Sequence, residues 1–337
     1  MKALVTDPGV RRFASVLEAQ TTDYSFEYCD PGDEQRINEL LPDADVFIGS
    51  KCTAQMLGTA AKLRFIHVPG AGTEKLAPEV WASDLVIANV FEHERSIAEY
   101  ILMAILALSH DLHTIDADLR EGVWRNPMIN PALPLRRVLA GQTIGLVGYG
   151  HIGQEVAGIS KLLGMKVAAI HQRPRSDPES TGLEFVGGPD DLPHLLEISD
   201  VVVVVVPLTE QTTGLIGAKE LHQMKRTAFL INVARGEVVQ ERALYDALRS
   251  GSIAGAALDV WYRVRPTTED VAPPSVLPFG ELPNVLMTPH VSGVTEHTFS
   301  GRARVIGENL ESFRTGSDIR NLVSNRHVTE DHPGEIA

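Results

Sequence analysis

Short runs of apolar residues alternate with segments of helical periodicity along almost the whole chain. The apolar runs have the length of buried strands and fall at residues 3–6, 46–49, 63–68, 144–148, 167–170, 201–206, 229–233 and 254–258. The run at 201–206 contains no polar position, as expected for a parallel strand that is covered on both faces. Strands that alternate with helices in this way predict an α/β fold with doubly wound parallel sheets.

The length of 337 residues is too great for one small hydrophobic core and predicts two domains. Residues 1–98 form a first α/β block, and the terminal segment 292–337 is expected to return to it through a helix. Residues 99–291 form the second block. Between the blocks, apolar side chains recur at helical spacing at Ile97, Ile101, Ile105 and Leu108. This helix is apolar on most sides, so we expect it to be buried between the domains or at a subunit contact.

Composition and charge exclude several classes of partner. The chain has 30 basic and 44 acidic side chains, so its net charge of −14 disfavours binding to nucleic acid or to an anionic membrane. Cys29 and Cys52 have neither metal-ligand spacing nor the number of a disulfide framework, so we expect two reduced thiols and no metal. The first residues lack a signal peptide, and the apolar run 101–108 is too short to span a bilayer. These features predict a cytoplasmic protein.

A glycine-rich turn joins a strand to a helix in the second block. Residues 148–153 read Gly-Tyr-Gly-His-Ile-Gly, with an apolar strand before them and helical periodicity after them. In a dinucleotide site Gly148 permits the tight turn, Gly150 lets the backbone approach the pyrophosphate, and Gly153 lets helix and strand pack closely. The N-terminus of the helix then faces the phosphates. The alternative is a plain glycine turn between two elements.

The end of the following strand bears on the choice between NAD and NADP. An NAD-binding chain usually has an acidic residue there, which holds the 2′-hydroxyl of the ribose. This chain instead has His171, Gln172 and Arg173, and an arginine can bind a 2′-phosphate through two hydrogen bonds. The sequence therefore predicts a preference for NADP over NAD. The alternative is an exposed basic turn with relaxed cofactor choice.

An ordered set of motifs extends this pattern over nearly the whole chain. Beyond the glycine turn, the motifs are Ser-Asp-Val at 199–201, Pro-Leu-Thr at 207–209, Asn-Val-Ala-Arg-Gly at 232–236, Ala-Leu-Asp-Val at 257–260 and Thr-Pro-His at 288–290. Together they resemble the D-isomer-specific 2-hydroxyacid dehydrogenases, a family that includes phosphoglycerate dehydrogenase, glyoxylate/hydroxypyruvate reductase and formate dehydrogenase. The resemblance implies two Rossmann-like domains with a cleft between them, a flavodoxin-like substrate domain built from both chain ends, and a homodimer.

The resemblance also implies a catalytic pair. Arg235 would bind the carboxylate of a small acid and polarise its 2-oxo group, which suits the fixed fork of a guanidinium. His290 would donate the proton in reduction and accept it in oxidation. Asp259 would orient the carboxamide of the nicotinamide. Each residue also has a plainer interpretation: a surface arginine, a core or loop histidine, and an aspartate that caps a strand end.

Further residues are assigned to ligands by the same resemblance. Around the cofactor they are His151, Ile152, His171, Gln172, Val206, Pro207, Thr212, Val233, Ala234 and Gly293, in addition to the glycines of the turn, Arg173, Asp259 and His290. Around the substrate they are Gly70, Ala71, Gly72, Lys51 and His93, in addition to Arg235. The loop at Gly70–Gly72 offers backbone N–H groups to a carboxylate, although an ordinary turn there is equally compatible with the sequence. For Lys51, which could reach an anionic tail of the substrate, the sequence favours a solvated lysine.

One position departs from the family pattern. Most members have a glutamate five residues after the aspartate that corresponds to Asp259, and it bonds the catalytic histidine; here that position is Val264. Valine can neither orient an imidazole nor stabilise its protonated form. His290 must therefore lack a partner or take one from elsewhere, and the candidates are Glu269, Asp270 and Glu94. Formate dehydrogenase departs at the same position, but His93 here replaces the asparagine that holds formate there.

Three functions therefore compete. The first is reduction of a 2-oxo acid, or oxidation of a D-2-hydroxy acid, with a nicotinamide cofactor. The second is formate-like hydride removal on the same fold. The third is a non-catalytic sensor of NAD(P), which the loss of the glutamate favours and the retention of Arg235 and His290 disfavours.

Overall fold

The computed structural model of the chain describes residues 1–172, 182–263 and 272–324. The chain divides into two compact units: among the described residues, the first comprises Met1–His93 and Thr295–Ser324, and the second comprises Glu94–Val294. The sequence placed the two boundaries at 98/99 and 291/292. Both lie a few residues away because the helix after residue 93 and the turn before residue 295 belong to the second unit.

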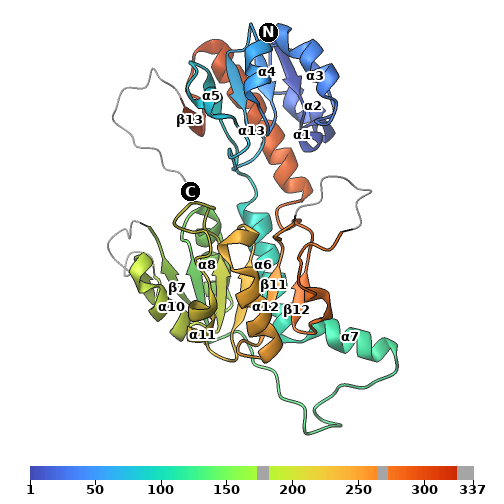
Figure 1. Cartoon of the computed structure of the whole chain (residues 1–337), viewed down its shortest axis with the longest axis vertical. Helices are drawn as coiled ribbons and strands as arrows, with labels where there is room; N and C mark the ends of the chain where they lie inside the picture. Colours follow the sequence, from blue (N-terminus) through green and yellow to red (C-terminus); the bar gives the residue numbers. More distant parts are fainter. Residues whose placement is uncertain (173–181, 264–271, 325–337) are drawn as a thin grey trace. The chain divides into compact units, whose positions relative to one another are not determined.

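The first unit is a six-stranded sheet with helices on both faces (Figure 1). Its strand order is β13-β5-β4-β3-β1-β2. The strands are β1 (Lys2–Val5), β2 (Ser25–Tyr28), β3 (Val46–Ile48), β4 (Phe65–His67), β5 (Val86–Ala88) and β13 (Leu322–Ser324). The helices are α1 (Pro8–Arg12), α2 (Ala14–Glu18), α3 (Glu34–Leu40), η1 (Leu41–Asp43), α4 (Ala54–Thr59), α5 (Pro78–Trp81) and α13 (Glu296–Thr315).

The edge strand β13 departs from the parallel pattern that the sequence predicted, because it pairs antiparallel with β5. It follows α13 after a short connection and covers the edge of β5. The run of residues that forms it is too short to be recognised as a strand from its own pattern.

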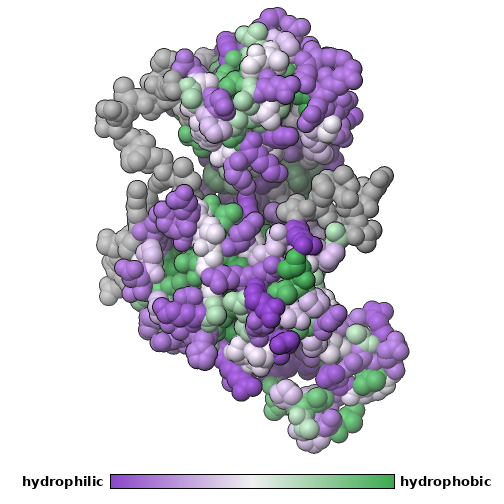
Figure 2. Space-filling view, viewed as in Figure 1, coloured by the Kyte–Doolittle hydropathy of each residue, from purple (hydrophilic) through white to green (hydrophobic). Residues whose placement is uncertain are grey.

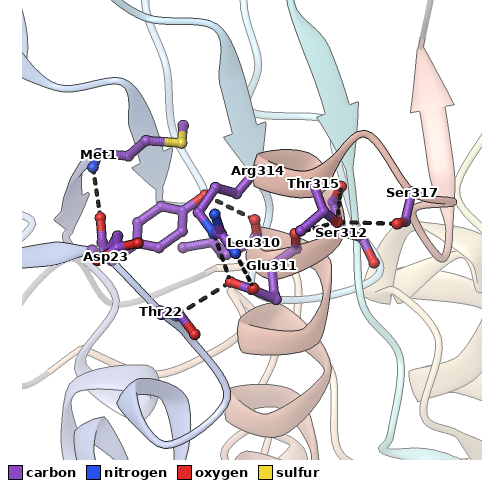
Figure 3. A network of polar contacts seen from close by, with 10 residues as sticks. Met1, Thr22, Asp23, Leu310, Glu311, Ser312, Arg314, Thr315 and Ser317 are labelled. Carbon is purple, nitrogen blue, oxygen red and sulfur yellow. Dashed lines mark hydrogen bonds and ion pairs between the residues drawn. The ribbon is translucent and has the colours of Figure 1, made fainter.

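The C-terminal helix α13 closes the first unit against the N-terminal elements. Ala303, Val305, Ile306 and Leu310 of α13 pack in one core cluster with Leu17 and with strand residues of β1, β3 and β4. Figure 3 shows the polar contacts at its end, where Glu311 accepts hydrogen bonds from the backbone of Thr22 and from Arg314. As expected, the C-terminal helix packs on the first block. Apolar side chains form the centre of this contact and polar residues form its edge.

The second unit is a seven-stranded sheet, all of whose strand pairs are parallel, in the order β12-β11-β10-β9-β6-β7-β8. The strands are β6 (Thr143–Val147), β7 (Lys166–Ile170), β8 (Phe185–Gly187), β9 (Val201–Val204), β10 (Phe229–Asn232), β11 (Gly255–Leu258) and β12 (Val285–Met287). The helices are α6 (Glu94–Ser109), α7 (Leu112–Arg120), α8 (His151–Leu162), η2 (Pro189–Asp191), α10 (Leu192–Ile198), α11 (Ala218–Gln223), η3 (Gly236–Val238), α12 (Glu241–Ser250) and η4 (Phe279–Glu281).

Helix α6 is buried inside the second unit. Ile97, Ile101, Ile105 and Leu108 pack in the same core cluster as residues of α8 and of strands β6, β9 and β10. The helix is therefore buried as the sequence predicted, but against the sheet and helix α8 of its own unit. Of its large apolar side chains, Met103 and Leu106 remain exposed.

A buried histidine joins β4 to α13 in the first unit. His67 is fully buried, its Nδ1 lies 3.2 Å from the Val68 carbonyl oxygen, and its Nε2 lies 3.0 Å from the Asn309 side-chain nitrogen. The Asn309 side chain in turn donates to the Arg320 carbonyl oxygen at 3.0 Å and accepts from the Arg320 backbone N–H at 2.9 Å. Burial lowers the pKa of His67 to about 4, partly offset by the hydrogen bond to Val68. The neutral imidazole is therefore the form that fits the fold.

This depressed pKa predicts a loss of stability in mild acid. The unfolded chain takes up the proton as pH falls through about 6.5, whereas folded His67 resists protonation down to a pKa of about 4. Between pH 7 and pH 5 the wild type should lose roughly 2 kcal/mol of unfolding free energy through this group. Urea denaturation of the wild type and of His67→Gln at both pH values measures it. Equal losses in the two proteins would contradict the assignment.

Candidate active site

The predicted cofactor and catalytic residues of the second unit follow the carboxyl ends of its strands. Gly148 follows β6, His171 follows β7, Val206 follows β9, Arg235 follows β10 and Asp259 follows β11. His290 likewise comes three residues after the end of β12. Because all these strands are parallel, their carboxyl ends lie at one edge of the sheet. Ligands of open α/β sheets bind at such an edge, at the point where the strand order reverses.

The glycine-rich turn has a backbone that only glycine fits. Gly148 has φ +111°, and a Cβ added there would lie 2.8 Å from the carbonyl oxygen of Val205. A Cβ added at Gly153 would lie 2.6 Å from the carbonyl oxygen of Gly148. Gly150 is the N-cap of α8, so the free N–H groups of the first helical turn follow it directly. The cradle fits a dinucleotide pyrophosphate, which needs close backbone approach and a helix N-terminus.

The reversal of strand order lies beside this turn. The chain passes from β6 outward to β7 and β8, and then to β9 on the other side of β6. Val206 is half-buried at the end of β9 and Pro207 is exposed, while the Thr212 hydroxyl donates to the Pro207 carbonyl oxygen at 2.6 Å. The segments after β6 and β9 therefore flank the point of strand-order reversal, where a dinucleotide is expected.

The segment expected to contact the adenosine ribose is described only in part. The backbone N–H of His171 donates to the Gly187 carbonyl oxygen at 2.9 Å, and its side chain is half-buried. Gln172 is exposed. Arg173, the residue on which the predicted NADP preference depends, lies outside the described residues.

A carboxylate lies near the start of the dinucleotide helix. Glu94 Oε1 is 4.0 Å from Nδ1 of His151, the first residue of α8, and Ile152 next to it is half-buried. Glu94 begins α6 and belongs to the second unit, not to the first block in which the predicted boundary at 98/99 placed it. Its candidacy as the partner of His290 stays a prediction.

Arg235 is held in an ordered backbone at the end of β10. The Asn232 side chain accepts from the backbone N–H of Ala234 at 3.0 Å and donates to the Arg235 carbonyl oxygen at 2.9 Å. Arg235 is half-buried and donates through Nη1 to the Ala234 carbonyl oxygen, while Val233 and Ala234 are buried. A Cβ at Gly236 would lie 2.6 Å from the Trp261 carbonyl oxygen, so this segment packs tightly on the one after β11.

Asp259 is fully buried and accepts three hydrogen bonds from the segment that carries His290. Its Oδ1 accepts from the Thr288 hydroxyl at 2.6 Å and from the Val291 backbone N–H at 2.9 Å. Its Oδ2 accepts from the Ser292 backbone N–H at 2.9 Å. The role of Asp259 toward the nicotinamide carboxamide stays a prediction, since these contacts already engage both carboxylate oxygens.

His290 is exposed and lies in the left-handed backbone region, with φ +59°. The nearby Gly293 is half-buried. The strands that lead to Arg235 and His290 are separated by one strand, β11. Since neighbouring strands lie about 4.8 Å apart, β10 and β12 run about 10 Å apart. The long side chains of Arg235 and His290 at these strand ends can therefore contact the same small molecule.

The predicted substrate residues of the first unit also follow the carboxyl ends of parallel strands. Lys51 follows β3, the loop with Gly70, Ala71 and Gly72 follows β4, and His93 follows β5. Lys51 is exposed, and its Nζ lies 3.9 Å from Glu34 Oε1, as a solvated lysine would. His93 is buried and stacks on Phe91.

Sequence reasoning missed two residues beside the Gly70–Gly72 loop. Asn89 donates from its side chain to the Ala71 carbonyl oxygen at 2.9 Å. Arg302 of α13 donates to the Phe91 carbonyl oxygen, and its Nη1 lies 3.9 Å from the position of a Cβ at Gly70. Arg302 comes from the far end of the chain, so no local pattern could have placed a cation beside the glycine loop.

Tyr100 and Trp261 were also missed as polar contacts. The Tyr100 hydroxyl lies 2.6 Å from Thr288 Oγ1, and the Trp261 indole donates to the Thr288 carbonyl oxygen at 2.8 Å. The sequence assigned neither residue a contact. Val264, which replaces the glutamate of the family pattern, lies outside the described residues, as do Glu269 and Asp270.

The described part of the chain contains no cluster of three or more histidine, cysteine, aspartate or glutamate side chains arranged to hold a metal ion. Among the same residues, no helix has the length and apolar character that crossing a membrane requires.

Comparison with known proteins supports the pattern of motifs. A relative from Korarchaeum cryptofilum described as glyoxylate reductase is 33% identical over 310 residues, which cover 90% of each chain. A relative from Methanocaldococcus jannaschii described as D-3-phosphoglycerate dehydrogenase is 29% identical over all of this chain, which spans 62% of the length of that relative.

A solved structure has the same fold. It is a D-isomer specific 2-hydroxyacid dehydrogenase from Xanthobacter autotrophicus Py2 in complex with NADPH and MES. It superposes with a TM-score of 0.75 at 26% identity and covers 96% of this chain and 98% of its own. The family model for the NAD binding domain of D-isomer specific 2-hydroxyacid dehydrogenases matches residues 102–292, more than half of the sequence. The chain therefore belongs to the D-isomer specific 2-hydroxyacid dehydrogenase family.

Proposed function

We propose that this chain is a nicotinamide-dependent reductase that converts a small 2-oxo acid into the D-2-hydroxy acid. The observation that carries the proposal is the placement of Arg235, Asp259 and His290 after β10, β11 and β12, at the same sheet edge as the glycine-rich turn. An arginine and a histidine at one edge supply an anion-binding fork and a proton carrier. Reduction of a 2-oxo acid needs both.

The residues of the chain have distinct tasks in this reaction. When bound, a reduced nicotinamide supplies the hydride. The guanidinium of Arg235 binds the substrate carboxylate and withdraws charge from the neighbouring oxo oxygen. The imidazole of His290 donates a proton to that oxygen, and in the reverse direction it removes the proton from the hydroxyl group.

The net charge of −14 makes a local cation essential for an anionic substrate. Arg235 supplies it in the second unit. In the first unit, the loop at Gly70–Gly72 presents backbone groups, and Arg302 lies beside that loop. Lys51 and His93 remain proposed substrate contacts, at the carboxyl ends of β3 and β5.

The first experiment tests Arg235 on a panel of glyoxylate, hydroxypyruvate and pyruvate. Arg235→Ala should lower kcat/KM by roughly 10³-fold, because it removes a charge that stabilises the transition state. Binding of NADPH, followed by its fluorescence, should be nearly unchanged. Arg242→Ala is the matched control, since Arg242 is an exposed arginine of α12 that pairs with Asp246.

Two outcomes would favour the other candidate functions. Tight cofactor binding without turnover of any 2-oxo acid would support a non-catalytic sensor. Oxidation of formate by the wild type would support formate-like chemistry. Turnover that survives Arg235→Ala at the control level would contradict the role given to the guanidinium.

We also propose that the cofactor is NADP rather than NAD, on the basis of His171, Gln172 and Arg173 at the end of β7. The predicted result is a higher kcat/KM with NADPH than with NADH. Arg173→Ala should lower the value for NADPH by about tenfold, the loss of about one charge-assisted hydrogen bond, and leave the value for NADH unchanged. A clear preference of the wild type for NADH would refute this proposal.

A homodimer is the assembly we propose, through residues 112–138 of the second unit. This segment comprises α7 and the chain after it, which extend away from the sheet of their unit (Figure 1), and Figure 2 shows apolar side chains on its surface. Its exposed large apolar residues are Leu112, Leu119, Val123, Trp124, Met128, Ile129, Leu135 and Val138, each at least 53% exposed. A contiguous set of exposed large apolar side chains is typical of a protein–protein interaction surface.

The double variant Trp124→Glu/Met128→Glu should be monomeric, because it places charges in the proposed apolar contact. Light scattering should give 36.7 kDa for this variant and twice that mass for the wild type. Val276→Glu is the control, since Val276 is a singly exposed apolar residue outside the segment. A monomeric wild type, or a dimeric double variant, would overturn the proposal.

A further inference from the structure

The backbone that carries His290 is fixed on both sides by one buried carboxylate. Asp259 accepts from the hydroxyl of Thr288, two residues before His290, and from the N–H groups of Val291 and Ser292, the two residues after it. A carboxylate removed from water is stable only when its oxygens are well bonded. The turn at residues 288–292 therefore stabilises the buried carboxylate of Asp259, and Asp259 in turn fixes the backbone of that turn.

His290 itself has a backbone conformation that it would not adopt unaided. Its φ of +59° lies in the left-handed region, which is uncommon and unfavourable for a residue with a Cβ. Such a conformation persists where the residues on either side are held in place. The contacts of Thr288, Val291 and Ser292 with Asp259 provide that restraint.

The chain of hydrogen bonds continues from Thr288 to helix α6. Asp259 is an acceptor only, so the single hydroxyl proton of Thr288 is directed to it, and the Tyr100 hydroxyl must then donate to Thr288 Oγ1. Burial raises the pKa of Tyr100 to about 12, with an opposing effect of Thr288 and a smaller raising effect of Asp259. The phenol is therefore a neutral donor at neutral pH.

We propose that Tyr100 is a positioning residue, which acts through Thr288 and Asp259 to hold His290 in place for proton transfer. The inference rests on the role of His290 proposed above. The restraint acts on the backbone of His290, through the contacts of Thr288, Val291 and Ser292 with Asp259. The Trp261 indole supports the same turn, since it donates to the Thr288 carbonyl oxygen.

The expected effect is on turnover rather than on binding. A displacement of about 1 Å at a reacting group can lower a rate by roughly 100-fold. Tyr100→Phe removes one neutral hydrogen bond to Thr288, the residue two positions before His290. We therefore expect kcat to fall roughly tenfold. The substrate KM and the NADPH Kd should change less than about twofold. The solvent deuterium isotope effect on kcat should rise, because proton transfer becomes more rate-limiting.

Matched variants separate this role from a loss of packing. Tyr262→Phe is the control, because Tyr262 is another largely buried tyrosine of the second unit, and its hydroxyl donates to the Val239 carbonyl oxygen at 2.9 Å, away from the turn. We expect Tyr262→Phe to keep the wild-type kcat and isotope effect. Thr288→Ser should retain most of the activity, whereas Thr288→Val should lose at least as much as Tyr100→Phe.

The double variant Tyr100→Phe/Thr288→Val tests whether the two residues act in one chain. Residues that act as a unit are not additive, so its kcat should be no lower than that of Thr288→Val. Independent losses that multiply would overturn the proposal, as would a Tyr100→Phe protein with the kcat and isotope effect of the wild type.

A spectroscopic measurement keeps the inference separate from the proposed function. The imidazole signals of His290, identified as those absent from His290→Asn, should shift or broaden in Tyr100→Phe and remain unchanged in Tyr262→Phe. If the wild type reduces no 2-oxo acid, the proposed function fails and these signals alone decide whether Tyr100 positions His290. Unchanged His290 signals in Tyr100→Phe overturn the positioning role.

Discussion

The chemistry proposed for this chain depends on the parallel direction of the seven strands in its second sheet. Parallel strands place all their carboxyl ends at one edge, so residues separated by more than a hundred positions in the sequence lie at the same side of one layer. The glycine-rich turn after β6 and the catalytic candidates after β10 and β12 share this edge. A sheet with mixed strand directions would have divided them between two edges.

Within that edge, Asp259 links two of the strands. Asp259 follows β11, is fully buried, and accepts three hydrogen bonds from the segment after β12. The donors include two backbone N–H groups, so the carboxylate fixes the path of the chain on both sides of His290. Electrostatics and backbone conformation are thereby coupled at the residue proposed to carry the proton.

The features that could be predicted from the sequence are those with a local physical signature. Gly148 and Gly153 were predictable because no other residue fits their backbone contacts, and the valine run of β9 because only a strand covered on both faces is apolar throughout. The fold class follows from the alternation of such elements. The contact of Tyr100 with Thr288 joins residues 188 positions apart, and Arg302 reaches the Gly70 loop from the C-terminal helix. Periodicity describes one element at a time, so it could not reveal such contacts; for the same reason Glu94 was assigned to the wrong unit.

The most direct test is the transfer of label from a reduced cofactor in which both hydrogens on the reactive carbon of the nicotinamide are deuterium. With hydroxypyruvate as the acceptor, mass spectrometry and chiral analysis of the product locate the deuterium. The account predicts D-glycerate with one deuterium at C2, formed by the wild type and lost in Arg235→Ala. A product without deuterium at C2, or the L-configured product, would contradict it.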